Sequence, residues 1–405
     1  MFEGFIGRTP IYNKSLELFG YDLQFGCQEF TEDVNPEKDF ASKDCIANAS
    51  SEIPLEKITG KKFGFVEAYP SLLSDQIEFS WPKDRVIFRV TDPLLASENS
   101  AANLQKLALQ GFSFDLETRC YRSFKEQAPD VAKICSIDAE VLSEELEEQM
   151  RFFRERGIKL LARNIQTPHQ YSLVDQFGFD YYQGNYFEKP KQIQGSEIPA
   201  NRLAVMHLLA RLQDPEIEIS EVEALISQDV SLSYKLLRLI NSAFFGVPKT
   251  VESISRAVVI YGLQRVANWA AVIMINAIDY KPQELLVTAL VRAKTCELLA
   301  EAMGRGKTER YYIAGLFSVL DAIMNVPMAR LAKNLNLIDE ISNALTDRSG
   351  PIGEVLAAVT AYERGASREV PRLPLVEGAV VGICLEAIEW ANQIYLQLNQ
   401  KGQNN

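Results

Sequence analysis

The chain has 405 residues, of which 47% are hydrophobic and 24% are charged, and its formal net charge is −12. This length predicts two domains of about 200 residues each, and the composition is that of a soluble globular protein. The acidic balance argues against a protein that binds nucleic acid, because such a protein needs a basic face.

The cysteine pattern and the N-terminal segment predict a cytoplasmic protein that does not enter a membrane. No Cys-x-x-Cys pair occurs, which favours free thiols over disulfides or a structural zinc site. Residues 1–10 do not resemble a signal peptide, and the longest apolar run, 266–278, contains Asn268 and Asn276 and is too short to span a bilayer. The six cysteines are Cys27, Cys45, Cys120, Cys135, Cys296 and Cys384.

The first half of the chain alternates strand-like and helical runs. The first two strand-like runs form a predicted hairpin, residues 31–57 form a predicted irregular stretch, and 93–110 and 138–157 are predicted helices. Strands that alternate with helices indicate a parallel sheet, and their number approaches the roughly eight strands of a barrel of the triosephosphate-isomerase type. The strand-like runs are 5–12, 16–25, 62–68, 85–90, 111–116, 131–137, 159–164 and 180–187.

The last of these runs is aromatic, is interrupted by Gly184 and is followed by Pro190. It predicts the final strand of the sheet, with the glycine allowing the backbone to pass close to another segment.

The residues that follow the strands of such a barrel are the candidates for chemistry, because its sites lie at the carboxyl ends of the strands. Here they mix acids and bases, whereas two-metal phosphodiester hydrolysis needs a ring of carboxylate and carbonyl oxygens. Arg89 and Arg163 place positive charge in this ring, where they could also bind phosphate. The candidates are Asp22, Glu67, Arg89, Glu117, Thr118, Arg119, Lys133, Arg163 and Gln183.

From residue 200 onward the apolar spacing is helical throughout, which predicts an all-α domain. The stretch 266–278 is apolar nearly all round and is predicted to lie at the centre of a bundle, and Ser220 is a predicted helix cap. The other predicted helices cover 203–210, 222–227, 232–240, 254–261, 285–303, 312–324, 328–335, 341–345, 352–362 and 376–398.

Motifs of the first half resemble an EAL domain, the family that hydrolyses cyclic di-GMP. The segment 21–25 (YDLQF) stands where the family has its Glu-Ala-Leu signature, and 183–187 (QGNYF) matches Gln-Gly-Tyr-x-Phe. Four further segments match the family motifs Glu-x-Thr-Glu, Asp-Asp-Phe, Lys-Ile-Asp and Ala-Glu-Gly-Val-Glu-Thr: 89–92 (RVTD), 117–119 (ETR), 133–135 (KIC) and 162–167 (ARNIQT).

The departures from this pattern predict that metal-dependent catalysis is lost. The resemblance implies that Arg89 and Arg163 replace metal-binding glutamates, and two cations in one small ring repel a divalent metal. The family's lysine and glutamine survive as Lys133 and Gln183; alternatively, Lys133 pairs with Glu117 or Asp22, and Gln183 caps backbone groups at the rim. The other replaced positions are Asp22, Glu67, Glu117 and Thr118.

The second half resembles an HDOD domain, a relative of the HD metal phosphohydrolases. Ser318 and Val319 stand where HD enzymes carry His-Asp. The chain has only two histidines, His169 and His207, which are interpreted as structural or surface residues, since a catalytic metal site normally takes three protein ligands. The matching segments are 226–237 (ISQDVSLSYKLL), 241–245 (NSAFF), 253–258 (SISRAV), 262–263 (GL) and 315–322 (GLFSVLDA).

The combined interpretation is a non-catalytic bacterial signalling protein with an EAL-type barrel at 1–190, a linker at 191–199 and an HDOD bundle at 200–405. We expect no metal or cofactor, and a protein partner that binds the HDOD domain. One alternative is a receptor for cyclic di-GMP that uses Arg89 and Arg163. Another is a weak phosphodiesterase that holds one ion with Asp22, Glu67 and Glu117. The resemblance also leaves a homodimer through the barrel open.

Overall fold

A computed structural model describes residues 5–26, 42–68, 79–91, 100–118, 131–142, 146–190, 200–212, 214, 216–242, 245, 250–278, 282–365, 373–375 and 379–399. The chain forms two compact units. The first comprises Met1–Phe187 with Ala361–Val370 and Val376–Val381, and the second comprises Glu188–Thr360, Pro371–Leu375 and Gly382–Asn405. The predicted linker at 191–199 and the candidate Arg119 lie outside the described residues, so both stay predictions.

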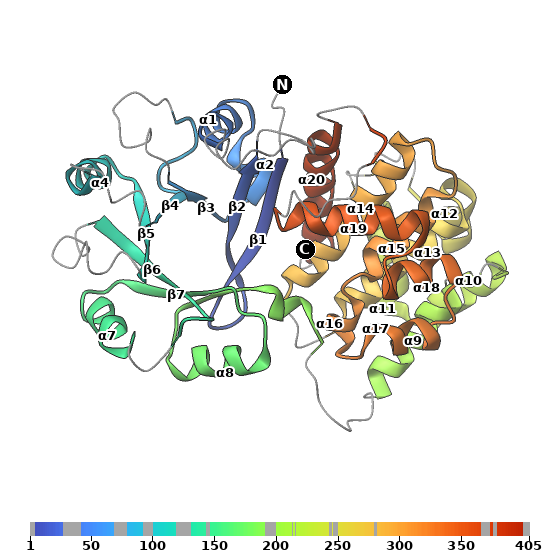
Figure 1. Ribbon diagram of the computed structural model, residues 1–405. Helices are drawn as coiled ribbons and strands as arrows, with labels where there is room; N and C mark the ends of the chain where they lie inside the picture. Colours follow the sequence, from blue (N-terminus) through green and yellow to red (C-terminus); the bar gives the residue numbers. More distant parts are fainter. Residues whose placement is uncertain are drawn as a thin grey trace, which may run out of the picture. The chain divides into compact units, whose positions relative to one another are not determined.

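The first unit is a closed barrel of eight strands, as predicted (Figure 1). β1 pairs antiparallel with both β2 and β8, and every other neighbouring pair is parallel. All eight predicted runs overlap an observed strand. The strands are β1 (Phe5–Asn13), β2 (Leu18–Gly26), β3 (Phe63–Glu67), β4 (Val86–Val90), β5 (Ser113–Glu117), β6 (Ala132–Asp138), β7 (Lys159–Arg163) and β8 (Tyr181–Gln183).

Helices lie outside the ring of strands (Figure 1), and two predictions about them are wrong. The stretch 31–57, expected to be irregular, contains a helix and the start of another; Leu55, Ile58 and Thr59 of the second are buried at helical spacing. The helix expected from residue 138 begins at Glu147, because β6 continues to Asp138. The helices are α1 (Ser42–Glu52), α2 (Leu55–Thr59), α4 (Ser100–Leu109), α7 (Glu147–Glu155) and α8 (Pro168–Gln176).

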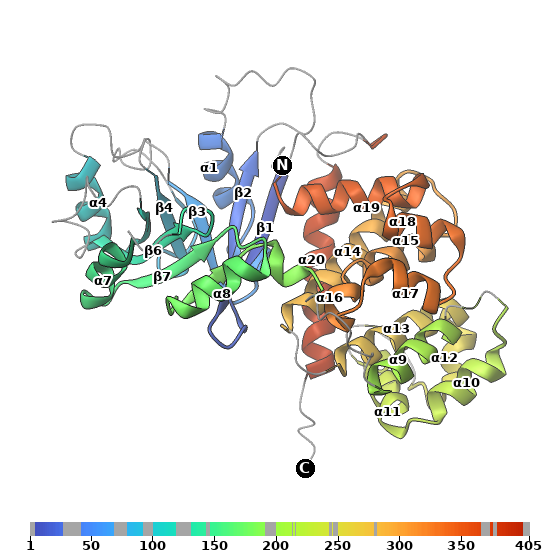
Figure 2. The ribbon, with the colours of Figure 1, turned by 60° about the horizontal axis from the view of Figure 1, so that its bottom comes forward.

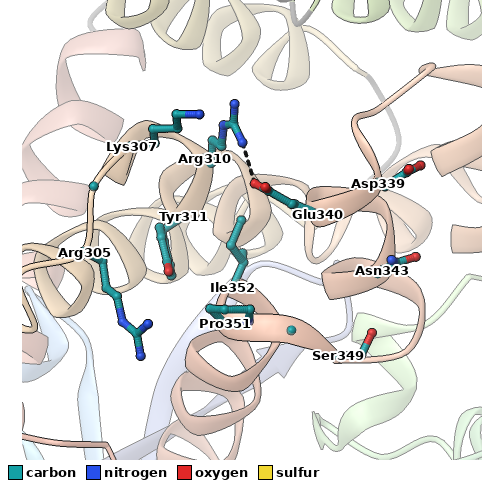
Figure 3. Close-up of a pocket in the computed structure, with 12 residues that line it drawn as sticks. Arg305, Lys307, Arg310, Tyr311, Asp339, Glu340, Asn343, Ser349, Pro351 and Ile352 are labelled. Atoms are coloured by element: carbon teal, nitrogen blue, oxygen red, sulfur yellow. Dashed lines mark hydrogen bonds and ion pairs between the residues drawn. The ribbon is translucent and has the colours of Figure 1, made fainter.

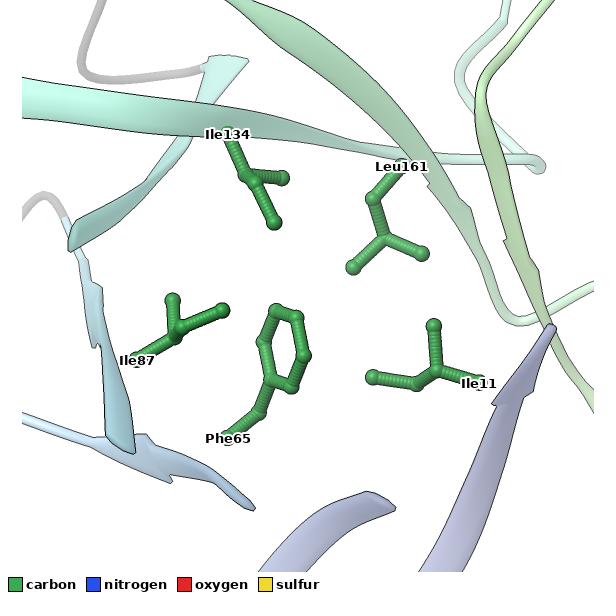
Figure 4. Packing of buried hydrophobic residues seen from close by; sticks show 5 residues of the cluster. All are labelled: Ile11, Phe65, Ile87, Ile134 and Leu161. Carbon is green, nitrogen blue, oxygen red and sulfur yellow. The ribbon is translucent and has the colours of Figure 1, made fainter. Parts of the chain in front are cut away.

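Apolar side chains from five strands fill the barrel interior (Figure 4). Because side chains alternate between the two faces of a strand, the residue two positions further along lies on the same face. Glu67, Arg89 and Arg163 therefore stand one layer above this core, toward the carboxyl ends of their strands. The core residues are Ile11, Phe65, Ile87, Ile134 and Leu161.

The predicted close approach at Gly184 is confirmed, but β8 is shorter than predicted. It ends at Gln183, and Asn185–Glu188 form a 3-10 turn, η5. Gly184 has φ +153°, and a Cβ there would lie 2.2 Å from the carbonyl oxygen of Ile165. The Tyr186 amide donates a hydrogen bond to the same oxygen over 3.0 Å. The chain after Gln183 therefore packs against the segment that follows β7 and does not continue as a strand.

Replacing Gly184 with alanine is expected to destabilise the barrel by about 3 kcal/mol, because the new Cβ overlaps backbone that cannot move freely. Gly157 offers a control, since it also has positive φ (+75°) but an added Cβ meets nothing within 4 Å. Gly157→Ala is expected to cost only about 1 kcal/mol of backbone strain. Urea unfolding of both variants measures the difference, and equal losses would contradict the packing argument.

The second unit is all-helical where it is described, as predicted. Ten consecutive residues of α13 are buried, and α13 contacts α9, α10, α11, α12, α14 and α15, which confirms its central place (Figure 2). The helices are α9 (Ala200–Leu212), α10 (Ile219–Ser227), α11 (Val230–Ile240), α12 (Ile254–Tyr261), α13 (Leu263–Asn276), α14 (Glu284–Ala302), α15 (Thr308–Phe317), α16 (Leu320–Met324), α17 (Met328–Asn334), α18 (Asp339–Thr346), α19 (Gly350–Glu363) and α20 (Ala379–Asn399).

Two details of the helical prediction are wrong. The helix expected over 312–324 is two helices, because α15 ends at Phe317 and α16 begins at Leu320, with Ser318 and Val319 between them. Ser220 is not a cap, since α10 begins one residue before it and Glu218 takes the N-cap position. None of the helices of the described residues is long and apolar enough to cross a membrane.

Candidate functional site

The mouth of the barrel is organised around Asp22 of β2. Its carboxylate is 1% exposed and lies between two arginines, Arg89 of β4 and Arg163 of β7. Arg89 Nη2 donates to Asp22 Oδ1, and Arg163 Nη2 donates to Asp22 Oδ2 over 2.7 Å. Three residues that the sequence placed at strand ends thus form one buried, charge-assisted cluster.

Two further carboxylates complete this arginine cluster. Arg89 Nε lies 3.7 Å from Asp115 Oδ2, and Arg163 Nη1 lies 3.9 Å from Glu117 Oε1. Glu117 was predicted, but Asp115 was missed, because only the residues at strand ends were considered. The alternation of Ser113, Asp115 and Glu117 along β5 was the available signal, since it places three polar side chains on one face.

The cluster is electrostatically asymmetric. Burial opposes the ionised form of Asp22, but Arg89 and Arg163 outweigh it and lower the pKa of that carboxyl below its ordinary value. Burial likewise raises the pKa of the Asp115 carboxyl, and there the same arginines only partly oppose it. Asp22 is therefore the ionised partner of both guanidinium groups, whereas at Asp115 the effect of burial on the pKa outweighs that of the arginines.

These residues do not fit a divalent metal. The EAL resemblance implies a cation at the carboxylate ring, yet guanidinium nitrogens already bind both oxygens of Asp22. A metal there would also face the fixed charges of Arg89 and Arg163 at close range. Among the described residues, no group of three or more His, Cys, Asp or Glu side chains is arranged to hold a metal ion.

Gln183 has the structural role that the sequence left open. Its Oε1 accepts a hydrogen bond from the Asn164 amide over 3.1 Å, and Asn164 Nδ2 in turn donates to Asp138 Oδ2 over 2.6 Å. Asn164 has a positive φ of 56°, a conformation that asparagine tolerates better than most residues. Gln183 thus supports the loop that follows β7.

Lys133 was predicted at a strand end, and this is wrong. It is the second residue of β6 and is exposed, because the side chains that share the interior face are Ile134 and Ser136. The carboxyl end of β6 has the sequence Ser-Ile-Asp at 136–138. The side chain that this end of β6 turns inward is therefore the buried Ser136 and not Lys133.

The last two barrel candidates lie beside the arginine cluster. Thr118 donates its hydroxyl to the carbonyl oxygen of Ser136 over 2.8 Å. Glu67 is exposed and stands opposite Arg89 in the register of β3 and β4. Burial lowers the pKa of Arg89, but the negative charges of Asp22, Asp115 and, to a smaller extent, Glu67 outweigh burial and raise that pKa.

In the helical unit, an arginine lies against the position where HD enzymes carry His-Asp. Ser318 is buried and donates to the carbonyl oxygen of Gly315 over 2.7 Å, while Val319 is fully buried. Arg292 of α14, only 3% exposed, donates from Nη1 to Ser318 Oγ over 3.4 Å and from Nη2 to Glu188 Oε2 over 2.9 Å. These side chains also do not fit a metal, because the buried charge beside Ser318 is already a cation.

Neither Arg292 nor Glu188 was predicted. A single arginine in the buried, apolar run of α14 was the available signal, but Glu188 lies 104 residues away in the sequence. Asp321 accepts a hydrogen bond from the Ala322 amide over 2.8 Å. Burial raises the pKa of Asp321, with Arg348 and Arg292 opposing. His169 and His207 are both exposed, as expected of surface residues.

The fold and these sites define a chain of two units, a closed α/β barrel and a helical bundle, each with an arginine beside its candidate site. Residues 198–347 match the HDOD domain family, so the C-terminal half carries an HDOD domain. The barrel and the relatives below are consistent with the predicted order of an EAL domain and then an HDOD domain.

Two relatives match almost the whole chain. The uncharacterized protein YuxH of Bacillus subtilis is 25% identical over 96% of this chain and 98% of its own length. The cyclic di-GMP phosphodiesterase CdgJ of Vibrio cholerae is 25% identical over 90% of this chain and 86% of its own length.

Solved structures resemble each half separately. The FimX EAL domain from Pseudomonas aeruginosa bound to c-di-GMP covers 48% of this chain and 93% of its own, with 13% identity and a TM-score of 0.35. An HDOD domain protein from Geobacter sulfurreducens covers 52% of this chain and 94% of its own, with 17% identity and a TM-score of 0.36.

Proposed function

We propose that this chain is a non-catalytic signalling protein, in which the barrel acts as a sensor or docking module and the HDOD bundle binds a partner protein. The observation that supports it is the pairing of both Asp22 oxygens with Arg89 and Arg163. A hydrolytic metal site needs free carboxylate oxygens on one side of the scissile phosphodiester. Here the buried carboxylate of Asp22 pairs both of its oxygens with cations of the protein itself.

The arrangement in the helical unit supports the same proposal. Arg292 lies against Ser318 with Glu188 as its carboxylate partner, so buried charge is neutralised within the protein. Both units keep the scaffold of a hydrolase fold while their polar side chains bind one another. A cytoplasmic location, a protein partner and dimerisation through the barrel are further parts of this proposal.

Incubation of the purified full chain with cyclic di-GMP and Mg²⁺ or Mn²⁺ tests the loss of catalysis. We expect no linear dinucleotide above a protein-free blank, with an active EAL enzyme as the positive control. The relative CdgJ is named a cyclic di-GMP phosphodiesterase, so hydrolysis of cyclic di-GMP is the activity to test for. Linear product formed by the wild type and lost in Asp22→Asn would contradict the proposal.

The receptor alternative needs a separate measurement. Each arginine donates to Asp22 through Nη2 alone, so the other N–H groups of Arg163, the less buried of the two, could bind a phosphate of cyclic di-GMP while the ion pair stays intact. Calorimetry of cyclic di-GMP against wild type and Arg163→Gln is therefore informative. Binding that the substitution abolishes would support a receptor, and binding that it leaves unchanged would exclude this phosphate-binding mode.

A further inference from the structure

A cavity of about 430 Å³ lies in the helical unit, apart from the side chains discussed above (Figure 3). The first turns of three helices line it: Arg310 and Tyr311 of α15, Asp339 and Asn343 of α18, and Ile352 of α19. This volume falls in the range of sites for small ligands of nucleotide size.

One wall of this cavity is cationic. Arg305 and Lys307 precede α15 and are exposed, and neither forms an ion pair with any residue that the structure describes. Arg310 is neutralised by Glu340 across the cavity (Figure 3). In a chain of net charge −12, two unneutralised cations on one wall attract an anion.

Tyr311 adds a hydrogen-bonding group to the wall of the cavity. The residue is only 5% exposed, it lines the cavity, and its hydroxyl has no hydrogen-bond partner among the described residues. Figure 3 shows the ring between Arg305 and Ile352. The hydroxyl itself is not enclosed by protein, so it can form a hydrogen bond with a molecule in the cavity.

The remaining walls suit a ligand that carries a polar body as well as an anion. α19 begins in the cavity with no acidic residue in its first turn, so its amide groups and helix dipole also favour negative charge. Asp339, Asn343 and Ser349 add hydrogen-bonding groups on the side away from Arg305 and Lys307 (Figure 3).

We propose that this cavity binds a phosphate monoester of nucleotide size, with the phosphate at Arg305 and Lys307 and the polar body at Asp339 and Asn343. The proposal concerns the helical unit alone and does not depend on the function proposed for the barrel. A base and ribose offer the donors and acceptors that an aspartate and an asparagine can bind, whereas a bare inorganic anion would use only the cationic wall.

Equilibrium binding to the full chain tests this, with the four nucleoside 5′-monophosphates, the matching nucleosides and inorganic phosphate as probes. We expect at least one monophosphate to bind about tenfold more tightly than its nucleoside, because only the phosphate can form charge-assisted hydrogen bonds with Arg305 and Lys307. Inorganic phosphate that binds as tightly as every nucleotide, or no binding by any monophosphate at millimolar concentration, would overturn the proposal.

Charge reversal then assigns the site. Arg305→Glu and Lys307→Glu are each expected to weaken the bound monophosphate about tenfold or more. Arg330→Glu on α17 is the matched control, since Arg330 is exposed, does not line the cavity and changes the net charge by the same amount. Far-ultraviolet circular dichroism checks that each variant is folded. Binding at this cavity would be ruled out if all three substitutions weakened monophosphate binding equally, or if neither Arg305→Glu nor Lys307→Glu weakened it.

Discussion

Arg89→Met is expected to destabilise the barrel by about 3–5 kcal/mol, because it leaves two carboxylates without their central cation. Asp22 and Asp115 are 1% and 0% exposed, so water cannot replace the lost guanidinium. Methionine keeps the length of the aliphatic side chain, which limits the loss to charge and hydrogen bonding. Hydrogen exchange of peptides from β2, β4 and β5 measures this loss in the barrel, without a contribution from the helical unit.

The loss should also depend on pH. The pKa of Asp22 is lower in the folded state than in the unfolded state, so ionised Asp22 stabilises the wild type fully at any pH above its unfolded-state pKa. This contribution is lost as the pH falls through the folded-state pKa of Asp22. Asp115 has the opposite sign, because its raised pKa makes stability fall as the pH rises through that pKa. Removing Arg89 takes away a cation that lowers the pKa of both Asp22 and Asp115, so both pKa values rise and the variant should lose more stability at pH 8 than at pH 5.

Arg151→Met is the control for this substitution. Arg151 is exposed on α7, and its replacement is expected to change stability by less than about 0.5 kcal/mol. If Arg89→Met were as stable as Arg151→Met at both pH values, the arginine cluster would contribute nothing to the fold. Its presence at the barrel mouth would then need another explanation.

The barrel could be predicted because each of its strands has a local signal. Strand-like runs with helical runs between them marked all eight strands, and the strand-end rule then placed Asp22, Arg89 and Arg163 together. Helix α1 and the start of α2 were not predicted, because 31–57 is rich in polar residues. Burial by neighbouring strands, which no local pattern records, decides that α2 forms there.

Side-chain direction explains most of what the sequence did not reveal about the site. Lys133 matched a motif by letters, yet alternation along β6 turns it outward and brings Ser136 to the mouth. Asp115 lies one layer inside the residues that were considered. The pair of Arg292 and Glu188 joins segments 104 residues apart, so only the three-dimensional fold brings the two charges together.

Arg89→Glu combined with Arg163→Glu is expected to create a divalent-metal site at carboxylates that Arg89 and Arg163 occupy in the wild type. The double substitution removes both cations from the mouth and adds two carboxylates beside Asp22, Asp115 and Glu117. Without metal, these carboxylates repel one another, so the variant should be less stable than the wild type. Bound Mn²⁺ should restore stability by about 2.7 kcal/mol at one hundred times its Kd, through linkage of binding to folding.

Thermal unfolding with EDTA and with increasing Mn²⁺ measures this gain, and calorimetry measures the metal affinity directly. Lys61→Glu with Arg151→Glu has the same change in net charge at exposed positions of the first unit, so it separates a built site from nonspecific attraction. Because Ser136 stands at the mouth in place of a lysine ammonium, the variant should bind the metal while hydrolysing cyclic di-GMP slowly or not at all. If the double variant folded in EDTA and showed no Mn²⁺-dependent stabilisation beyond that of the control, the two arginines would not be what keeps metal out of this barrel.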